Sequence, residues 1–304
     1  MPEERRKLVI GVGELLWDCF PDWRRPGGAP ANVAFHASQL GLAGAICSGV
    51  GTDAGGDELV RYVGERGLDT RWIQRDPHHP TGTVTVDTTR PEHPTYVIHE
   101  NVAWDFLQFD EPSAELFAAA AVVCYGTLAQ RCAASRETIR RALTAAEQAL
   151  RVYDVNLRPP WYTAEIVAES LRLAHVVKLN ADEVGELGRL LSLPADPPEG
   201  FAAALRERYG VRLVCVTRGG RGCLLLSETE RVDVAGRPVE VVDAVGAGDA
   251  FTAALSYGLV QGWPVARAAH LANEVGALVA GQAGAMPVLG EALADALRRC
   301  APGT

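Results

Sequence analysis

The 304-residue sequence has little positive charge, no paired cysteines and no long hydrophobic run. It carries 29 Lys and Arg against 38 Asp and Glu, a formal net charge of -9, and no basic block. This balance argues against general binding to nucleic acid or to an acidic membrane. The seven cysteines form no CxxC pair, and no stretch approaches the length that crosses a bilayer. We therefore expect a reduced, cytoplasmic protein.

Two glycine-rich nucleotide motifs are also missing. The chain has no GxxxxGK[ST] sequence, which excludes a P-loop protein. Its GAG turn at 246–248 lacks the third glycine of the dinucleotide-binding GxGxxG pattern, and Asp249 follows directly. An NAD-dependent oxidoreductase therefore stays only as an alternative, which an absence of nicotinamide binding would eliminate.

Short β-branched runs alternate with helical patterns along most of the chain. The run "KLVIGVG" predicts a first strand, and "ANVAFHASQLG" predicts a helix with Pro30 in its first turn and Gly41 at its end. Later runs continue the alternation as far as the β-branched segment 238–243. The pattern predicts one α/β domain over residues 1–304, with a mainly parallel sheet and helices on both faces. Ligands are then expected at the carboxyl ends of the strands.

Two segments interrupt this alternation. Residues 81–103 contain two strand-like runs around a Pro-rich tip, and residues 14–26 leave the first strand without a helix of its own. We expect segments 14–30 and 81–105 to form a small sheet that covers the strand ends as a lid. The alternative is a surface hairpin without function. A lid with one apolar face could also pair with a second copy, which would give a homodimer.

The stretch "VVDAVGAGDAF" at 241–251 combines two aspartates, a glycine-rich turn and the start of an apolar helix. Unpaired amides of Ala247, Gly248 and Asp249, together with the helix dipole, predict an anion site. We expect Asp249 to stay ionised there and to accept the proton of an attacking hydroxyl, as phosphoryl transfer to an alcohol requires. The alternative is that Asp249 only caps the helix and the glycines only turn the chain.

Two motifs resemble one known family. "GGAPANVAFHASQLG" at 27–41 and "DAVGAGDAF" at 243–251 are similar to the N-terminal and C-terminal signatures of the ribokinase-like (PfkB) sugar kinases. The resemblance runs over essentially the whole chain. It implies a Rossmann-like three-layer α/β sandwich with a small β lid, and an ATP-dependent sugar kinase activity.

The resemblance also implies roles for residues around the sugar. Asp249 matches the catalytic base, and the anion hole matches Gly246, Ala247 and Gly248. Sugar contacts match Asp18, Gly27, Gly28 and Asn32. Arg158, in "DVNLRPPWY", is the candidate for a phosphate contact. Asp243 matches a position tied to a monovalent-cation loop, so K⁺ is expected as an activator, although Ala244 stands where many members have threonine.

A second group of residues matches the nucleotide and metal sites. "KLNADE" at 178–183 is similar to an NxxE motif, which implies that Asn180 and Glu183 organise Mg²⁺ and its waters. "TRGGRG" at 217–222 matches a nucleotide loop with Thr217, Gly219 and Gly222, and it is also expected to be a turn between two strands. Asn273 falls where the family lines its adenine pocket.

The acceptor is expected to be D-fructose. "GELLWD", "DVNLRPPWY" and "VAWD" look most like fructokinase branches, but ribokinase, 2-keto-3-deoxygluconate kinase and nucleoside kinase share the same machinery. A non-catalytic sugar sensor on the same fold is a further alternative. The retained Asp249, Asn180 and Glu183 argue against it, because a sensor needs no base and metal organisers together.

Overall fold

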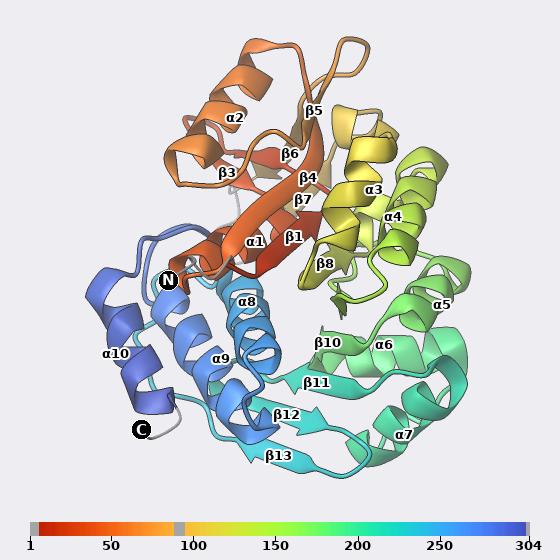
Figure 1. Ribbon diagram of the computed structural model, residues 1–304, viewed down its shortest axis with the longest axis vertical. Helices are drawn as coiled ribbons and strands as arrows, with labels where there is room; N and C mark the ends of the chain where they lie inside the picture. The colour runs from red at the N-terminus through yellow and green to blue at the C-terminus, as the bar shows by residue number, and fades with distance from the viewer. Residues whose placement is uncertain (1–5, 88–94, 302–304) are drawn as a thin grey trace.

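The computed structural model describes residues 6–87 and 95–301 and contains a large twisted sheet (Figure 1). The order of its strands is β13-β12-β11-β10-β9-β8-β1-β4-β5. Their bounds are β1 Leu8–Val12, β4 Ala43–Gly51, β5 Ile73–Asp76, β8 Val122–Gly126, β9 Leu150–Asp154, β10 Val176–Asn180, β11 Leu213–Thr217, β12 Cys223–Leu226 and β13 Arg231–Val234. Neighbours from β5 to β11 pair in parallel, and β12 and β13 add an antiparallel edge. The predicted parallel sheet is confirmed.

Helices cover both faces of this sheet (Figure 1). One layer contains α1 Ala29–Gln39, α2 Ala54–Glu65, α8 Ala247–Val260, α9 Val265–Ala280 and α10 Gly290–Cys300. The opposite layer contains α3 Glu111–Ala118, α4 Ala133–Ala145, α5 Ala164–Leu173, α6 Ala181–Leu191 and α7 Pro198–Tyr209. Short 3₁₀ turns lie at Ala103–Phe106, Leu128–Gln130 and Gly219–Arg221. Central strands such as β8 are buried along their whole length, because apolar side chains on both of their faces pack against helices.

A second sheet has the strand order β3-β2-β6-β7. Its strands are β2 Leu16–Cys19, β3 Arg24–Gly27, β6 Gly82–Asp87 and β7 Thr95–Ile98. They come from the two segments that interrupt the alternation, and β6 alternates between buried and more exposed positions because one face packs inward. The small sheet of the expected fold is therefore present. Its function as a lid stays a prediction, and the Pro-rich tip lies outside the described residues.

The β-branched run 238–243 does not form a strand. The backbone N–H groups of Val242 and Asp243 both donate to Ala280 O at the end of α9. The side chains of Val241 and Val242 are 62% and 63% exposed. The run leads from the edge strand β13 to α8 without pairing with a strand, so its apolar side chains stay at the surface.

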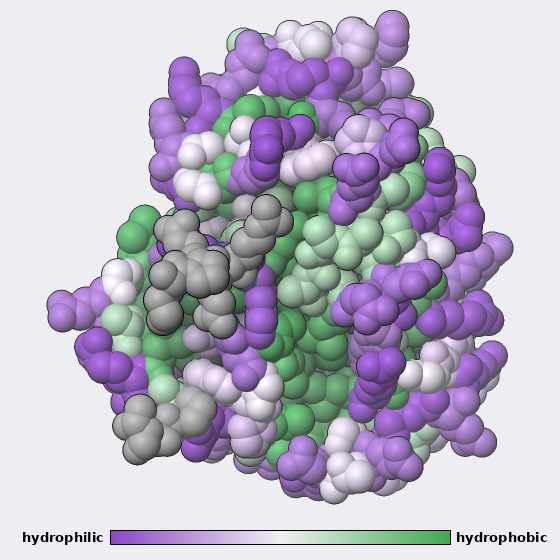
Figure 2. Space-filling view, viewed as in Figure 1, coloured by the Kyte–Doolittle hydropathy of each residue, from purple (hydrophilic) through white to green (hydrophobic). Residues whose placement is uncertain are grey.

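Polar side chains cover the rim of the face seen in Figure 2, and hydrophobic ones gather in its middle, over the central strands. Each of the seven cysteines is a free thiol. Within residues 6–87 and 95–301, no helix is both long and apolar enough to cross a membrane.

Candidate active site

The start of α8 provides a main-chain anion site. Gly246 precedes the helix with φ +79, and a Cβ there would lie 2.6 Å from Ala285 Cα, so the turn requires glycine. Among the described residues, no side chain caps this helix start. The N–H of Ala247 donates to Ala244 O over a long 3.3 Å, and within residues 6–87 and 95–301 no backbone acceptor is recorded for Gly248 or Asp249. The first helical amides are therefore available to an anion.

The segment beyond α9 supports this turn from behind. His36 Nε2 lies 2.9 Å from Ala285 O, and the side chain of Gln39 bonds both Pro287 O and the N–H of Leu289. Burial lowers the pKa of His36 to about 4, so its ring is neutral at pH 7. The contacts hold residues 285–289 against α1, where they fix the position of Gly246.

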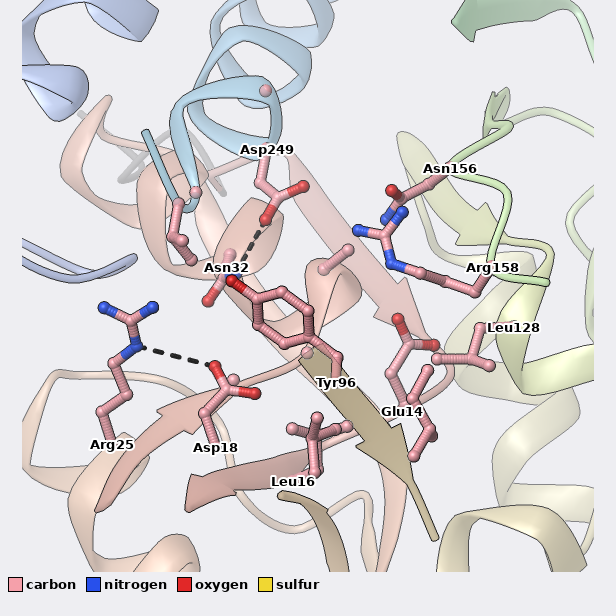
Figure 3. Close-up of a pocket in the computed structure, with 18 of the residues that line it drawn as sticks. Glu14, Leu16, Asp18, Arg25, Asn32, Tyr96, Leu128, Asn156, Arg158 and Asp249 are labelled. Carbon is pink, nitrogen blue, oxygen red and sulfur yellow. Dashed lines mark hydrogen bonds and ion pairs between the residues drawn. The ribbon is translucent and has the colours of Figure 1, made fainter. Parts of the chain in front are cut away.

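Asp249 lies in the first turn of α8 but does not cap the helix. Its Oδ2 accepts a 2.7 Å hydrogen bond from Asn32 Nδ2 of α1 (Figure 3). Removal from water and, to a smaller extent, the charge of Asp154 raise the pKa of Asp249, whereas Lys178, Asn32 and Arg158 lower it, and the net pKa is about 6. The effect of burial on the pKa of Asp249 is thus larger than the opposing effect of the helix dipole, but with a pKa of about 6 the carboxylate is still about nine-tenths ionised at pH 7.

Asn32 has one oxygen without a partner. The side chain is 3% exposed, its Nδ2 is bonded to Asp249, and its Oδ1 makes no hydrogen bond in the described part of the chain. Buried polar atoms are normally paired, so a free acceptor in a cleft points to a ligand that supplies a donor.

Arg25 connects the small sheet to the loop before α8. Its guanidinium lies 3.6 Å from Asp18 Oδ2 and 2.5 Å from Asp243 Oδ2. Burial raises the pKa of Asp18, and Arg25 opposes that rise. Burial also acts to raise the pKa of Asp243, but hydrogen bonds from the N–H groups of Val245 and Gly284, together with Arg25, hold it below its usual value.

A single cleft of about 720 Å³ brings most of the predicted sugar and catalytic residues together. Its lining includes Asp18, Gly27, Gly28, Asn32, Arg158, Asp243, Gly246, Gly248 and Asp249, but not Ala247. Figure 3 shows Asp18 and Asp249 on opposite sides of this space. Gly28 has φ +118, and a Cβ there would lie 2.3 Å from Glu14 O, so its close contact is with the chain itself.

The cleft residues that the sequence analysis missed include Glu14, Arg25, Tyr96 and Lys178. Lys178 is buried, both oxygens of Asp154 lie 3.0 Å from its Nζ, and the Nζ lies 3.0 Å from where a Cβ on Gly248 would be. Glu14 lies two residues after β1 in "GELLWD", and Lys178 lies in "KLNADE", two residues before the end of β10. Their places at the carboxyl edge of the sheet were the available signal.

The predicted nucleotide residues lie outside this cleft, along the same edge of the sheet. Thr217 pairs in register with Asn180, and its Oγ1 lies 3.4 Å from Leu179 O. The 217–222 turn, which includes Gly219 and Gly222, contacts segment 234–236: a Cβ on Gly236 would lie 1.9 Å from Gly220 O.

Asn273 of α9 donates to Ala235 O at 3.0 Å and so joins the same group of segments. The structure therefore gathers the predicted nucleotide residues in one region. Their contact with a nucleotide stays a prediction.

Asn180 and Glu183 form a capping box at the start of α6. Asn180 Oδ1 accepts from the N–H of Glu183, whose two oxygens accept from the N–H groups of Asn180 and Leu157. Both carboxylate oxygens are thus already bonded. In the described parts of the chain, no group of three or more His, Cys, Asp or Glu is placed to hold a metal. The pair does not fit direct Mg²⁺ coordination, and only an arrangement through waters fits its geometry.

Arg158 differs from the other cationic side chains of the cleft. Its Nη1 donates to Leu157 O, and no ion pair is recorded for it within residues 6–87 and 95–301. Together with the free helix start and the partly ionised Asp249, it makes an arrangement typical of enzymes that transfer phosphoryl groups to alcohols.

Comparisons with known proteins identify the family. The model of the pfkB family carbohydrate kinases matches residues 12–291. A Salmonella typhimurium fructokinase is 32% identical over 296 residues, which cover 91% of this chain and 94% of that protein. Among solved structures, a Xylella fastidiosa fructokinase with bound ATP has a TM-score of 0.86 at 25% identity, with 97% and 99% of the two chains covered.

A Vibrio cholerae fructokinase double mutant, in a form with bound fructose, ADP and potassium ion, has a TM-score of 0.82 at 27% identity and covers 96% and 99% of the chains. The chain belongs to the pfkB family of carbohydrate kinases, and it is an ATP-dependent carbohydrate kinase. The family and the ribokinase-like fold predicted from the two signatures are confirmed.

Proposed function

We propose that the enzyme phosphorylates a neutral sugar, with D-fructose as the first candidate, and that Asp249 is the general base. One observation supports this most: Asp249, the free Oδ1 of Asn32 and the carboxylate of Asp18 face one cleft beside an uncapped helix start. The fructokinases among its relatives favour fructose.

Each of these cleft residues has a separate role in the proposed reaction. Asp18 binds sugar hydroxyls, and Asn32 positions Asp249 and accepts a hydrogen bond from the sugar. Asp249 accepts the proton of the attacking hydroxyl. The amides at the start of α8 and the guanidinium of Arg158 stabilise the charge on the transferred phosphoryl group.

ATP would bind along the edge formed by the 217–222 turn, segment 235–243 and Asn273. The exposed side chains of Val241 and Val242 offer apolar surface to a base. Mg²⁺ would accompany the ATP phosphates and keep its own waters, which Asn180 and Glu183 would orient from behind. The potassium ion in the related fructokinase supports K⁺ as an activator beside Asp243, whose charge is already shared with Arg25.

The test is coupled ADP release over a panel of neutral sugars, sugar acids and nucleosides, with Mg²⁺ present and with or without K⁺. We expect turnover with D-fructose above that with ribose or 2-keto-3-deoxygluconate. Release of ADP with none of these acceptors would contradict the proposal. Sugar binding in calorimetry without any turnover would indicate a sensor instead.

We also propose that the small sheet mediates a homodimer. Trp23, Tyr96 and Val97 on its segments are 55%, 58% and 55% exposed, and such apolar side chains favour a partner surface. Light scattering should give twice the 32.4 kDa chain mass, and Val97→Glu should lower it. A single 32.4 kDa species for the unaltered protein would contradict this arrangement.

A further inference from the structure

Glu14 is a buried carboxyl group with an unsatisfied oxygen. It follows β1 at the carboxyl edge of the large sheet, it is 4% exposed, and it lines the cleft. Its Oε2 makes no hydrogen bond within the described residues. Figure 3 shows its carboxylate directed into the cavity, across from Asp249 and apart from Asp18.

A structural role does not account for this arrangement. Buried carboxyl groups that stabilise a fold are paired or fully hydrogen-bonded, because an unpaired polar atom loses its hydration without compensation. No ion pair is recorded for Glu14 in the described parts of the chain, although Arg158 lies near enough to favour its ionised form. An unpartnered oxygen directed into a cleft is instead suited to a ligand donor.

The cations of the cleft are already engaged. Arg25 is shared by Asp18 and Asp243, and Lys178 is paired with Asp154. In the proposed function, the remaining cation, Arg158, binds the transferred phosphate. None of these three cations is left for an anionic group on the sugar.

We propose that Glu14 recognises a second hydroxyl of the acceptor sugar, apart from the hydroxyls bound by Asp18, and that it makes the cleft selective for neutral sugars over sugar acids. The proposal rests on the sugar kinase function proposed above. A sugar carboxylate at this position would meet the carboxylates of Glu14 and Asp249 without a free cation to offset them.

The protonation of Glu14 agrees with this role. Burial raises the pKa of Glu14, hydrogen bonds from the backbone N–H groups of Glu14 and Ala29 lower it, and the net pKa is about 7. Near neutral pH the group is therefore present in both forms. The protonated form can donate a hydrogen bond to a sugar oxygen, and both forms can accept one from a hydroxyl.

The experiment combines variants of Glu14 with deoxy sugars. Glu14→Leu removes both hydrogen-bonding oxygens, Glu14→Gln keeps the shape without the charge, and Glu207→Gln on α7 is an exposed control. For the best sugar of the panel, Glu14→Leu should raise KM roughly tenfold and change kcat by less than about threefold. Calorimetry without ATP should show the same loss of sugar affinity. Glu14→Gln should retain most of this affinity and bind sugar acids better than the unaltered enzyme.

The deoxy sugars separate direct contact from structural damage. One deoxy position should abolish the difference between the unaltered enzyme and Glu14→Leu, because the lost hydroxyl and the lost carboxyl belong to the same contact. Equal losses for every deoxy sugar, or unchanged affinity in a folded Glu14→Leu protein, would overturn the proposal. A thermal midpoint for Glu14→Gln above that of the unaltered protein at pH 8 would show that a buried charge has been removed. If the unaltered enzyme used no sugar at all, the proposed function itself would fail.

Discussion

Replacing Asp249 by asparagine tests the general base with little change in shape. The amide oxygen of the new side chain can still accept the hydrogen bond from Asn32 Nδ2, which is 2.7 Å long in the native protein. What is lost is the proton acceptor for the sugar hydroxyl. General-base catalysis contributes about 10²–10⁴-fold, so we expect kcat to fall by that factor while sugar affinity changes by less than about threefold.

The pKa of Asp249 sets the pH dependence. With a pKa of about 6, the carboxylate is about nine-tenths ionised at pH 7 and about one-tenth ionised at pH 5. Since the base must be ionised to accept a proton, kcat should fall roughly tenfold between these pH values. The residual activity of Asp249→Asn should lack this acid limb.

The same substitution should not destabilise the fold. Because the pKa of Asp249 is higher in the folded protein than its ordinary value of 3.8, the contribution of this group to the free energy of unfolding is fully present below about pH 3.8 and is lost as the pH rises through about 6. At pH 7 the ionised group therefore costs about 2 kcal/mol, after allowance for its partial exposure to the cleft. Urea unfolding of Asp249→Asn at pH 7 should show equal or greater stability.

The matched control is Asp182→Asn, an exposed aspartate in the first turn of α6. It should change turnover by less than about twofold and stability by less than about 1 kcal/mol. Turnover of Asp249→Asn within tenfold of the unaltered enzyme would refute the base assignment. A large loss of stability in that variant would refute the described environment of the carboxylate.

Three further predictions concern the surroundings of the site. Asn32→Ala removes a hydrogen bond that lowers the pKa of Asp249, so the acid limb of the kcat profile should move to higher pH. A shift of about one pKa unit would leave the carboxylate about half ionised at pH 7, so kcat there should fall about twofold; an unmoved limb would contradict this. Because the pKa of His36 is lowered to about 4, the protein should lose up to about 3 kcal/mol of stability as the pH falls from about 6.5 towards 4. The difference between the free energies of unfolding in urea at pH 6.5 and at pH 4 should be smaller for His36→Gln than for the unaltered protein. Gly28→Ala should cost about 1–3 kcal/mol or more, because of its positive φ and the 2.3 Å approach of the new Cβ to a carbonyl oxygen. In the same assay, Gly185→Ala in α6 should stabilise by up to about 1 kcal/mol, because no described residue other than its neighbours in the helix lies within 4 Å of a Cβ added there.

The alternation of short apolar runs predicted the large sheet and its helices, because buried parallel strands require apolar residues on both faces. The same criterion failed for residues 238–243, since the sequence does not reveal whether a neighbouring strand is available for pairing. The alternation did not select the site residues: the glycine-rich turn and the family resemblance singled out Asp249, and the resemblance alone singled out Asp18, which lies within β2. The structure places both carboxylates in one cleft.

Contacts between distant residues could not be read from the sequence. Arg25 meets Asp243 across 218 positions, and nothing local marks either as the partner of the other. Glu14 lies within the motif "GELLWD", but no local pattern distinguishes it, because its burial depends on the packing of α1 against the end of β1. Such pairings follow from tertiary packing, which local patterns do not encode.

The contact of His36 with Ala285 has a consequence for the order in which the protein assembles. These residues are 249 positions apart, and between them they hold the glycine turn in place. A growing chain on the ribosome therefore cannot fix the turn at the start of α8 until residue 285 has been synthesised. Catalytic competence should therefore come only after much of the central sheet, whose strands all precede residue 285, has had time to pair.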